Sequence, residues 1–402
     1  MKLKVKWRSR IDPKNSYSIL LINHSSRYGA MPTPLKKSDG KELCDILTMF
    51  GSNVAIFSVK ERKLLSESPL DIERWRRRAI VASAKQIYGA ERSIRSATHI
   101  IRSDRSKGLP LPPQSEIQIH RIAVSLGSHG RAPITSRDYG KGFVHVFDDE
   151  SFSTIMSELD TASDFFEYLS KKLAFLTNSS HVLLEGGEED LLAVYLTKGR
   201  QFPKSTGLIS IGPDIWDNFR KRREYIAKKD ADKVSAIWDG LIEYVTRHAL
   251  AGTLEFGSSL SDVELALRQM AAENRYQRRL LGQAFDEFLQ QSAKRIRSRL
   301  VISESGAIYV FLAKPLDTKR EDRIRELLTR CFVAKGKFRG YPTVVGIATE
   351  EYVPNQGFSL DLAYMSKPQW TDDDQKAFDK AQSLLSYFNG DAHKFDQDEY
   401  PT

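Results

Sequence analysis

The chain has 402 residues, which is long enough for two or three domains that each bury a core. Hydrophobic residues make up 41% and charged residues 28%, which is ordinary for a soluble protein, and no apolar run approaches membrane-spanning length. The first residues lack the apolar core of a signal peptide, and Cys44 and Cys331 lie far apart in sequence. We therefore expect a reduced, cytoplasmic protein without a membrane segment or a disulfide.

Residues 17–23 predict a strand, and a polar loop at 24–39 separates it from two short apolar segments joined by Gly51-Ser52-Asn53. These segments predict a β-hairpin between residues 42 and 60, because Gly, Ser and Asn tolerate the backbone angles of a tight turn. If Gly51 and Ser52 form a two-residue loop, Phe50 faces Asn53. A three-residue loop would shift the pairing by one position.

Two charged residues stand out in the predicted hairpin, Asp45 in the first strand and Lys60 at the end of the second. With the two-residue loop, Asp45 lies opposite Ser58, and Lys60 is its diagonal neighbour on the same face. A carboxylate beside a lysine at the open end of a hairpin can hold a divalent cation and polarise a water for attack on phosphate. The alternative is a simple salt bridge at a strand end, and the hairpin by itself favours that alternative.

A long helix is predicted from about residue 70 to residue 97, after Pro69 and with Asp71 as its cap. One face of it carries residues at spacings of three and four, namely Trp75, Ala79, Ala82, Gln86 and Ala90. Gln86 therefore lies in a stripe that packs against the sheet, where a glutamine needs hydrogen-bond partners. Its partner is either a nearby backbone carbonyl, or a metal-bound water or phosphate beside the hairpin.

Strands predicted at 117–124 and 143–147 complete a mixed α/β layer, so we assign residues 1–148 to a first domain. Residues 149–299 form a mainly helical middle region, in which four carboxylates at 185–190 either start a helix or bind a cation. The helix start is favoured, because acidic residues there complement the helix dipole. The expected apolar core of this region is Ile155, Leu159, Phe165, Phe166, Leu169, Trp216, Phe219, Ile226, Ile237, Trp238, Ile242 and Val245.

The last part of the chain, residues 300–402, returns to an α/β pattern. Continuous apolar segments at 308–313 and 343–348 predict buried strands, and a helix at 319–334 lies between them. A final helix begins after the capping sequence at 371–374 and reaches about Tyr387. The polar tail from Asn389 to Thr402 is expected to be mobile.

The net charge of +9 comes with clustered basic residues, a pattern that suits a polyanion such as nucleic acid. Further clusters lie at 275–279 and 294–299, and solvated helix faces are the alternative for each cluster. The candidates for contact with nucleic acid are Arg76, Arg77, Arg78, Arg220, Lys221, Arg222 and Arg223.

The hairpin and the following helix resemble the core of the PD-(D/E)XK nuclease superfamily. That superfamily places an Asp at the start of one strand, an acid-x-Lys triplet on the next, and in some members a metal-site Gln on a following helix. Asp45, the triplet 58–60 and Gln86 fall at those places, and Glu42 matches the upstream glutamate of many members. The chain departs at the second acidic position, which holds Ser58, and a hydroxyl makes a poorer magnesium ligand than a carboxylate.

The full length is also similar to a bacterial family of roughly four-hundred-residue proteins known mainly from sequence. This likeness supports the domain layout without implying an activity. The matching stretches are residues 42–60, 86–92, 143–169, 187–192 and 251–256.

The superfamily resemblance implies a nuclease-like mixed-sheet domain and a nuclease that cleaves phosphodiester bonds with Mg²⁺ or Mn²⁺. In this interpretation Asp45 and Glu42 bind the metal, Lys60 orients the water, and Gln86 holds that water or the substrate. DNA is favoured over RNA, and anti-phage defence is a common context for the superfamily. The alternative is a catalytically degenerate nuclease fold that binds nucleic acid or a partner protein within a defence complex, and Ser58 is its best argument. A homodimer is left open.

Overall fold

The computed structural model describes residues 43–101, 107–178, 182–204, 207–251, 253, 259–291, 295–350, 359–388 and 397–401. The chain is α/β, as its pattern predicted, and it divides into two compact units, Met1–Lys221 and Arg222–Thr402. The predicted helical middle region thus contributes helices to both units. The predicted strand at 17–23 and Glu42 lie outside the described residues.

The first unit is built on a mixed five-stranded sheet of order β1-β2-β5-β7-β6. Strand β1 pairs antiparallel with β2, whereas β5 runs parallel to both of its neighbours, β2 and β7. Phe50 faces Asn53 across the turn, which confirms the predicted two-residue loop and its register. The strands are β1 (Ile46–Phe50), β2 (Asn53–Glu61), β5 (Gln118–Leu126), β6 (Arg137–Asp138) and β7 (Phe143–Phe147).

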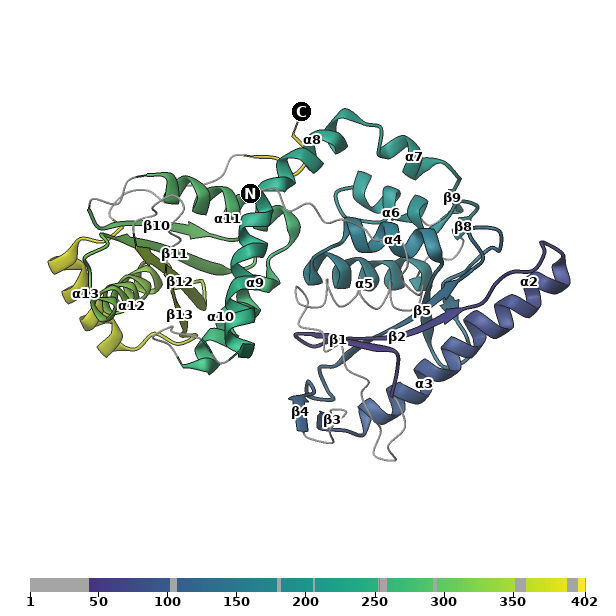
Figure 1. Ribbon diagram of the computed structural model, residues 1–402, viewed down its shortest axis with the longest axis horizontal. Helices are drawn as coiled ribbons and strands as arrows, with labels where there is room; N and C mark the ends of the chain where they lie inside the picture. The colour runs from purple at the N-terminus through teal and green to yellow at the C-terminus, as the bar shows by residue number, and fades with distance from the viewer. Residues whose placement is uncertain are drawn as a thin grey trace. The chain divides into compact units, whose positions relative to one another are not determined.

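One face of this sheet is covered by the predicted helix, which runs as α2 (Pro69–Arg76), a π-helical turn η1 (Arg77–Val81) and α3 (Ala82–Arg95) (Figure 1). Its cap is Ser68 and not Asp71, because the Ser68 hydroxyl accepts a hydrogen bond from the backbone N–H of Asp71. The π turn adds a residue to the helical repeat and so rotates the stripe that faces the sheet. Ala82 and Gln86 are therefore only half-buried.

The opposite face of the sheet is covered by α4 (Asp149–Glu158), α5 (Ala162–Asn178) and α6 (Glu188–Thr197) (Figure 1). The predicted apolar residues of α4 and α5 are buried there, and Phe165 stacks on Phe57 of β2 with ring centroids 6.2 Å apart. Smaller elements complete the unit, namely β3 (His99–Ile101), β4 (Lys107–Pro110), β8 (Val182–Leu184), β9 (Ile209–Ile211) and α7 (Ile215–Phe219).

The second unit has a four-stranded sheet of order β10-β11-β12-β13, in which only β11 and β12 run parallel. The crossover between them is α12 (Arg320–Lys337), which confirms the predicted strand-helix-strand arrangement. The strands are β10 (Arg297–Ile302), β11 (Ala307–Lys314), β12 (Thr343–Glu350) and β13 (Leu360–Ser366).

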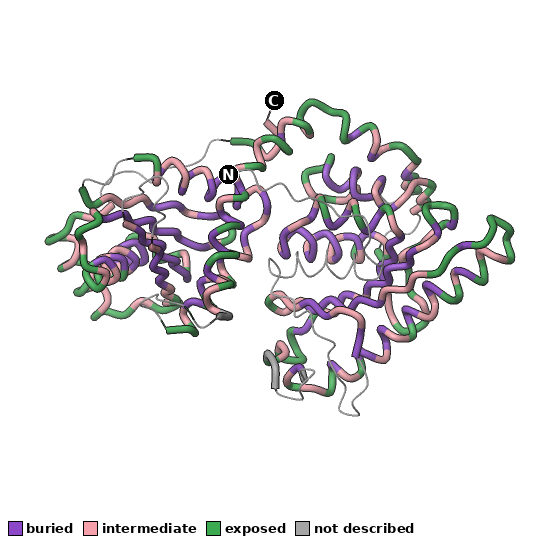
Figure 2. Tube along the Cα trace, in the orientation of Figure 1, coloured by how far each residue is buried: buried purple, intermediate pink, exposed green. Residues whose placement is uncertain are grey.

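Apolar side chains cover both faces of this second sheet, and β11 is buried along its whole length (Figure 2). One core packs the sheet against α9, α10 and α11, and the other packs it against α12. The remaining helices are α8 (Arg223–Ala231), η2 (Asp232–Val234), α9 (Ser235–Ala251), α10 (Leu260–Ala272), α11 (Arg275–Gln290) and α13 (Asp372–Leu385).

Three predictions for this part of the chain are wrong. Residues 297–299 are not helical but begin strand β10, because β11 offers them a partner strand. Ile226 is 57% exposed, since α8 is short and largely polar. The end of the tail, residues 397–401, is not detached: Arg279 donates hydrogen bonds to the backbone carbonyls of Asp398 and Glu399.

Candidate functional site

The open end of the β1–β2 hairpin holds Asp45 in a fixed position. Its backbone N–H donates to the carbonyl of Phe57 at 3.2 Å, so the pairing of the two strands extends one residue beyond β1. Its carboxylate oxygen Oδ2 accepts the backbone N–H of Val59 at 2.6 Å. The carboxylate therefore lies against β2 beside Ser58 and Lys60.

Gln86 of α3 joins the polar side chains of the hairpin. Its oxygen Oε1 accepts a hydrogen bond from Lys60 Nζ at 2.6 Å, and it lies 3.1 Å from the Ser58 hydroxyl. Its nitrogen Nε2 faces Asp45 Oδ1 at 3.4 Å. The sequence left a backbone carbonyl, or a metal-bound water or phosphate, as the partner of Gln86. Its described hydrogen bonds are instead with the hairpin side chains of Asp45, Ser58 and Lys60.

We call Asp45, Ser58, Lys60 and Gln86 the hairpin cluster. The structure brings together these four of the five residues that the sequence singled out, and Glu42 is the fifth. Ser58 is fully buried, whereas the other three are half-buried. The cluster combines one carboxylate with one ammonium group, so its charges balance.

A resident magnesium ion does not fit the described part of this cluster. Asp45 supplies its only carboxylate, and hydrogen bonds already engage both carboxylate oxygens. No group of three or more His, Cys, Asp or Glu side chains suited to a metal occurs among the residues that the structure describes. A magnesium site prefers charged oxygen ligands, and Ser58 offers a hydroxyl where a second carboxylate would be needed.

The acidic run at 185–190 behaves as a helix start. Gly187 is the N-cap of α6, and Asp190 accepts hydrogen bonds from the backbone N–H groups of Gly187 and Trp216. Glu188 is buried and pairs with the buried Lys172 at 2.5 Å. Burial raises the pKa of Glu188, and the nearby Lys172 ammonium opposes that rise. These carboxylates are therefore used by the fold itself.

The predicted nucleic-acid contacts differ in their exposure and in their ion pairs. Arg77 and Arg78 are exposed on the π turn that precedes the helix of Gln86. Arg76 is only 31% exposed in its side chain and pairs with Glu73 at 3.3 Å. The four basic residues at 220–223 are exposed, and Arg220 pairs with Asp217 at 2.8 Å.

Two serines near the cluster were missed at the level of sequence. Ser83 is buried on α3 and its hydroxyl lies 3.2 Å from that of Ser58. Ser125 of β5 is the register partner of Lys60, and its buried hydroxyl has no hydrogen-bond partner within the described part of the chain. The spacing of three residues between Ser83 and Gln86 was an available signal, because such residues share a helix face.

Comparison with known proteins adds no family to these observations. No family model matches the chain, and neither a curated protein nor a solved structure matches it. Within the described ranges, no helix combines the length and the apolar character that crossing a bilayer requires.

Proposed function

We propose that the first unit binds nucleic acid and that the hairpin cluster holds one of its phosphodiester groups. The proposal rests on the hydrogen-bond donors of Lys60. An ammonium group has three N–H donors, and in the described structure Gln86 takes one of them. The two others remain for the oxygens of a phosphate, while Gln86 keeps the long lysine side chain in place.

Exposed basic residues lie close in sequence to the hairpin cluster, both after β2 and on the helical run that carries Gln86. Arg62 and Lys63 directly follow β2, which ends one residue after Lys60. Arg77, Arg78 and Lys85 are exposed on the helical run that carries Gln86. Such residues attract a polyanion and contact its backbone without reading its sequence.

Binding without cleavage agrees best with the composition of the cluster. Metal-dependent hydrolysis of a phosphodiester needs a cation that is held by charged oxygens and that stabilises the developing charge. The described cluster has one carboxylate, and Ser58 takes the position where the resembling superfamily keeps the second. We therefore propose a nuclease-like binding module as the leading function.

A metal-dependent nuclease is the second candidate. The observation in its favour is that Asp45, Lys60 and Gln86 converge at the end of the hairpin in one hydrogen-bonded network. In this candidate Glu42 would supply the missing carboxylate, and Mg²⁺ or Mn²⁺ would activate a water and neutralise charge on the phosphate. A role in anti-phage defence, alone or with a partner protein, is supported for either candidate by the superfamily resemblance only.

The two candidates are separated by one set of binding and cleavage measurements. Labelled single-stranded DNA, duplex DNA and RNA are titrated with the protein in EDTA, and the same oligonucleotides are incubated with magnesium or manganese. We expect Lys60→Met to weaken binding of every nucleic acid by about tenfold, which is about 1.4 kcal/mol. Lys60→Arg should retain part of the affinity.

The matched control is Lys198→Met, which removes an exposed lysine that follows α6 on the other face of the sheet. It should change affinity less than twofold. Equal affinities for Lys60→Met and Lys198→Met would contradict the proposed phosphate site. Cleavage that requires magnesium and disappears with EDTA, or in Asp45→Asn, would establish the nuclease instead.

A further inference from the structure

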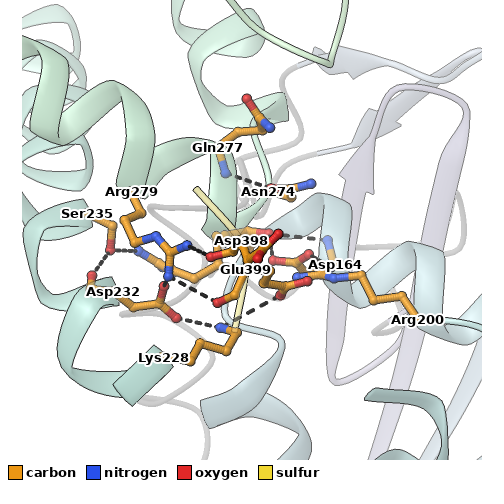
Figure 3. Close-up of polar contacts among 12 residues, drawn as sticks. Asp164, Arg200, Lys228, Asp232, Ser235, Asn274, Gln277, Arg279, Asp398 and Glu399 are labelled. Carbon is orange, nitrogen blue, oxygen red and sulfur yellow. Dashed lines mark hydrogen bonds and ion pairs between the residues drawn. The ribbon is translucent and has the colours of Figure 1, made fainter. Parts of the chain in front are cut away.

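The segment 397–401, with the sequence Gln-Asp-Glu-Tyr-Pro, contacts α11 of the second unit, and Figure 3 shows Arg279 beside Asp398 and Glu399. Three of its successive backbone carbonyls accept hydrogen bonds from side chains of α11. Tyr276 donates its hydroxyl to the carbonyl of Gln397. Arg279 donates from Nη2 to the carbonyl of Asp398 at 2.6 Å and from Nη1 to that of Glu399 at 3.1 Å.

Neighbouring side chains orient the Arg279 guanidinium for this contact. Its guanidinium lies over the ring of Tyr276 at 4.8 Å, and Asp232 Oδ1 is 3.3 Å from Nη1. Tyr276 and Arg279 are three residues apart and so project from the same face of α11. The planar guanidinium can present two donors in fixed geometry, which suits two neighbouring carbonyls.

Side chains add selectivity to the backbone contacts. Lys228 of α8 places its ammonium 3.8 Å from the Glu399 carboxylate and 5.8 Å from the centre of the Tyr400 ring. Gln397 donates from Nε2 to the Oε1 atom of Gln283 at 3.1 Å. Lys228 therefore contacts both an acidic residue and the aromatic residue that follows it.

We propose that Lys228, Tyr276, Arg279 and Gln283 form a peptide-binding site whose ligand is an extended acidic peptide with an acid-aromatic pair. We call these four residues the tail-binding surface, and the segment 397–401 is its built-in occupant. Main-chain carbonyls provide the hydrogen bonds, and pockets or charges for particular side chains provide the selectivity, as in other modes of extended-peptide recognition.

A peptide fits this surface better than nucleic acid does. The described contacts of Arg279 and Tyr276 with the segment 397–401 are to neutral carbonyl oxygens. Asp232 also lies 2.5 Å from Lys228 Nζ and 3.3 Å from Arg279, so it offsets one of the two positive charges. A phosphate placed here would face that carboxylate at close range, whereas a peptide carbonyl would not be repelled to the same extent.

The built-in occupant should compete with an external peptide of the same chemistry. A segment tethered to its own site acts at an effective concentration of order millimolar. An external acidic peptide therefore binds strongly only when the tail has been displaced. The tail-binding surface thus admits a partner that carries several such motifs or that first removes the tail.

The test uses the full-length chain with residues 397–401 replaced by Gly and Ser, which empties the surface without shortening the protein. A fluorescent, capped Gln-Asp-Glu-Tyr-Pro peptide is titrated into this open variant and into the wild type, and circular dichroism checks that both are folded. We expect saturable binding to the open variant and at least tenfold weaker binding to the wild type. Peptides with Lys in place of Glu399, or Ala in place of Tyr400, should bind at least fivefold more weakly.

A second substitution in the open variant tests the geometry of the surface. Tyr276→Phe keeps the ring but removes the hydroxyl donor, so it should weaken the peptide severalfold. Tyr244→Phe on α9, where the tyrosine is 43% exposed, is the matched control and should not. Absence of saturable binding by the folded open variant, or equal binding by wild type and open variant, would overturn the proposal. A gain of salt-sensitive DNA binding without peptide binding would also overturn it, in favour of a polyanion surface.

Discussion

Lys60 donates a hydrogen bond from its ammonium group to Gln86 Oε1 over 2.6 Å, although 26 positions separate the two residues in sequence. The same amide presents its nitrogen to Asp45 at 3.4 Å. An amide is suited to this position because it can accept from a cation and donate to a carboxylate at once. Gln86 therefore sets the distance between the two charges of the hairpin cluster.

Substitution of Ser58 by aspartate should create the metal site that the described cluster lacks. A second carboxylate at this fully buried position would repel Asp45 and lose hydration, so the metal-free variant should melt about 5 °C below wild type. Magnesium should recover that loss, because it binds only the folded state. Differential scanning fluorimetry with and without magnesium measures both effects.

The control for that substitution is Ser93→Asp, at a half-buried position farther along α3. Its melting temperature should not respond to magnesium beyond the response of wild type. A Ser58→Asp protein that melts identically with and without magnesium would show that the missing second acid does not explain the absence of a metal site.

Replacement of Arg77 and Arg78 by glutamine should reduce the salt dependence of duplex DNA binding. Each lost phosphate contact lowers the slope of log affinity against log salt by about 0.9, so the double variant should lose roughly 1.8. Because phosphate contacts carry no sequence information, different DNA sequences should weaken alike. The measurement is fluorescence anisotropy at several salt concentrations.

The comparison for this pair is Arg247→Gln with Arg325→Gln, which removes two arginines that are 70% and 78% exposed in the second unit. This variant loses the same net charge and should keep the wild-type slope. If both double variants have the same slope, the π turn does not contact the phosphate backbone.

Acid should destabilise the first unit through His120. Burial, aided by the nearby Arg121 charge, lowers the pKa of His120 to about 4 from its ordinary value of 6.5. Between these pH values the unfolded chain binds a proton that the folded chain does not, so stability is full above about pH 6.5 and falls as pH decreases towards 4. The loss attributable to His120 is about 3 kcal/mol.

Urea denaturation across this pH range measures that effect. His120→Gln should remove part of the decline, while the buried His145 keeps another part, because burial also lowers its pKa. The control is His129→Gln, whose side chain is 72% exposed. A decline as steep in His120→Gln as in wild type would show that His120 does not cause it.

Arg278 should matter for folding and not for binding nucleic acid. It is fully buried, pairs with Asp239 at 2.7 Å and donates to the carbonyls of Glu273 and Ala271. Arg278→Met should lower the free energy of unfolding by about 3 kcal/mol, since it leaves buried groups unpaired. Arg268→Met, at a 61% exposed position, should change it by less than about 0.5 kcal/mol. A stable Arg278→Met protein that no longer binds DNA would contradict this assignment.

The hairpin cluster was predictable because local rules determine most of it. Gly51 has a φ of +57°, a left-handed conformation that glycine adopts without strain, and the two-residue turn then fixes which hairpin residues share a face. The spacing of three and four residues along the helix predicted that Gln86 faces the sheet. The same spacing places Ser83 on the helix face of Gln86, but its contact with Ser58 depends on how the helix packs on the sheet.

The basic residues of α11 show what sequence alone could not decide. Arg275, Arg278 and Arg279 form a cluster in sequence. Such a cluster suggests a polyanion-binding surface, because the sequence does not reveal whether its side chains are exposed or buried. In the structure Arg275 and Arg278 share Asp239, and Arg279 contacts Asp232 and the tail. The acidic partners lie 36 to 47 positions away, so the pairing is visible only once the helices have packed.

Asp45→Asn tests the central claim most directly, because the two candidate functions predict opposite results. If the hairpin cluster binds a phosphodiester without cleaving it, removal of the negative charge beside Lys60 should tighten DNA binding severalfold, while the asparagine oxygen can still accept the Val59 N–H. Asp71→Asn, on α2, should leave binding unchanged. The measurement is DNA affinity in EDTA, with a parallel cleavage assay in magnesium. Tighter binding with no cleavage by either protein is the predicted result; magnesium-dependent cleavage by wild type that Asp45→Asn abolishes would contradict it.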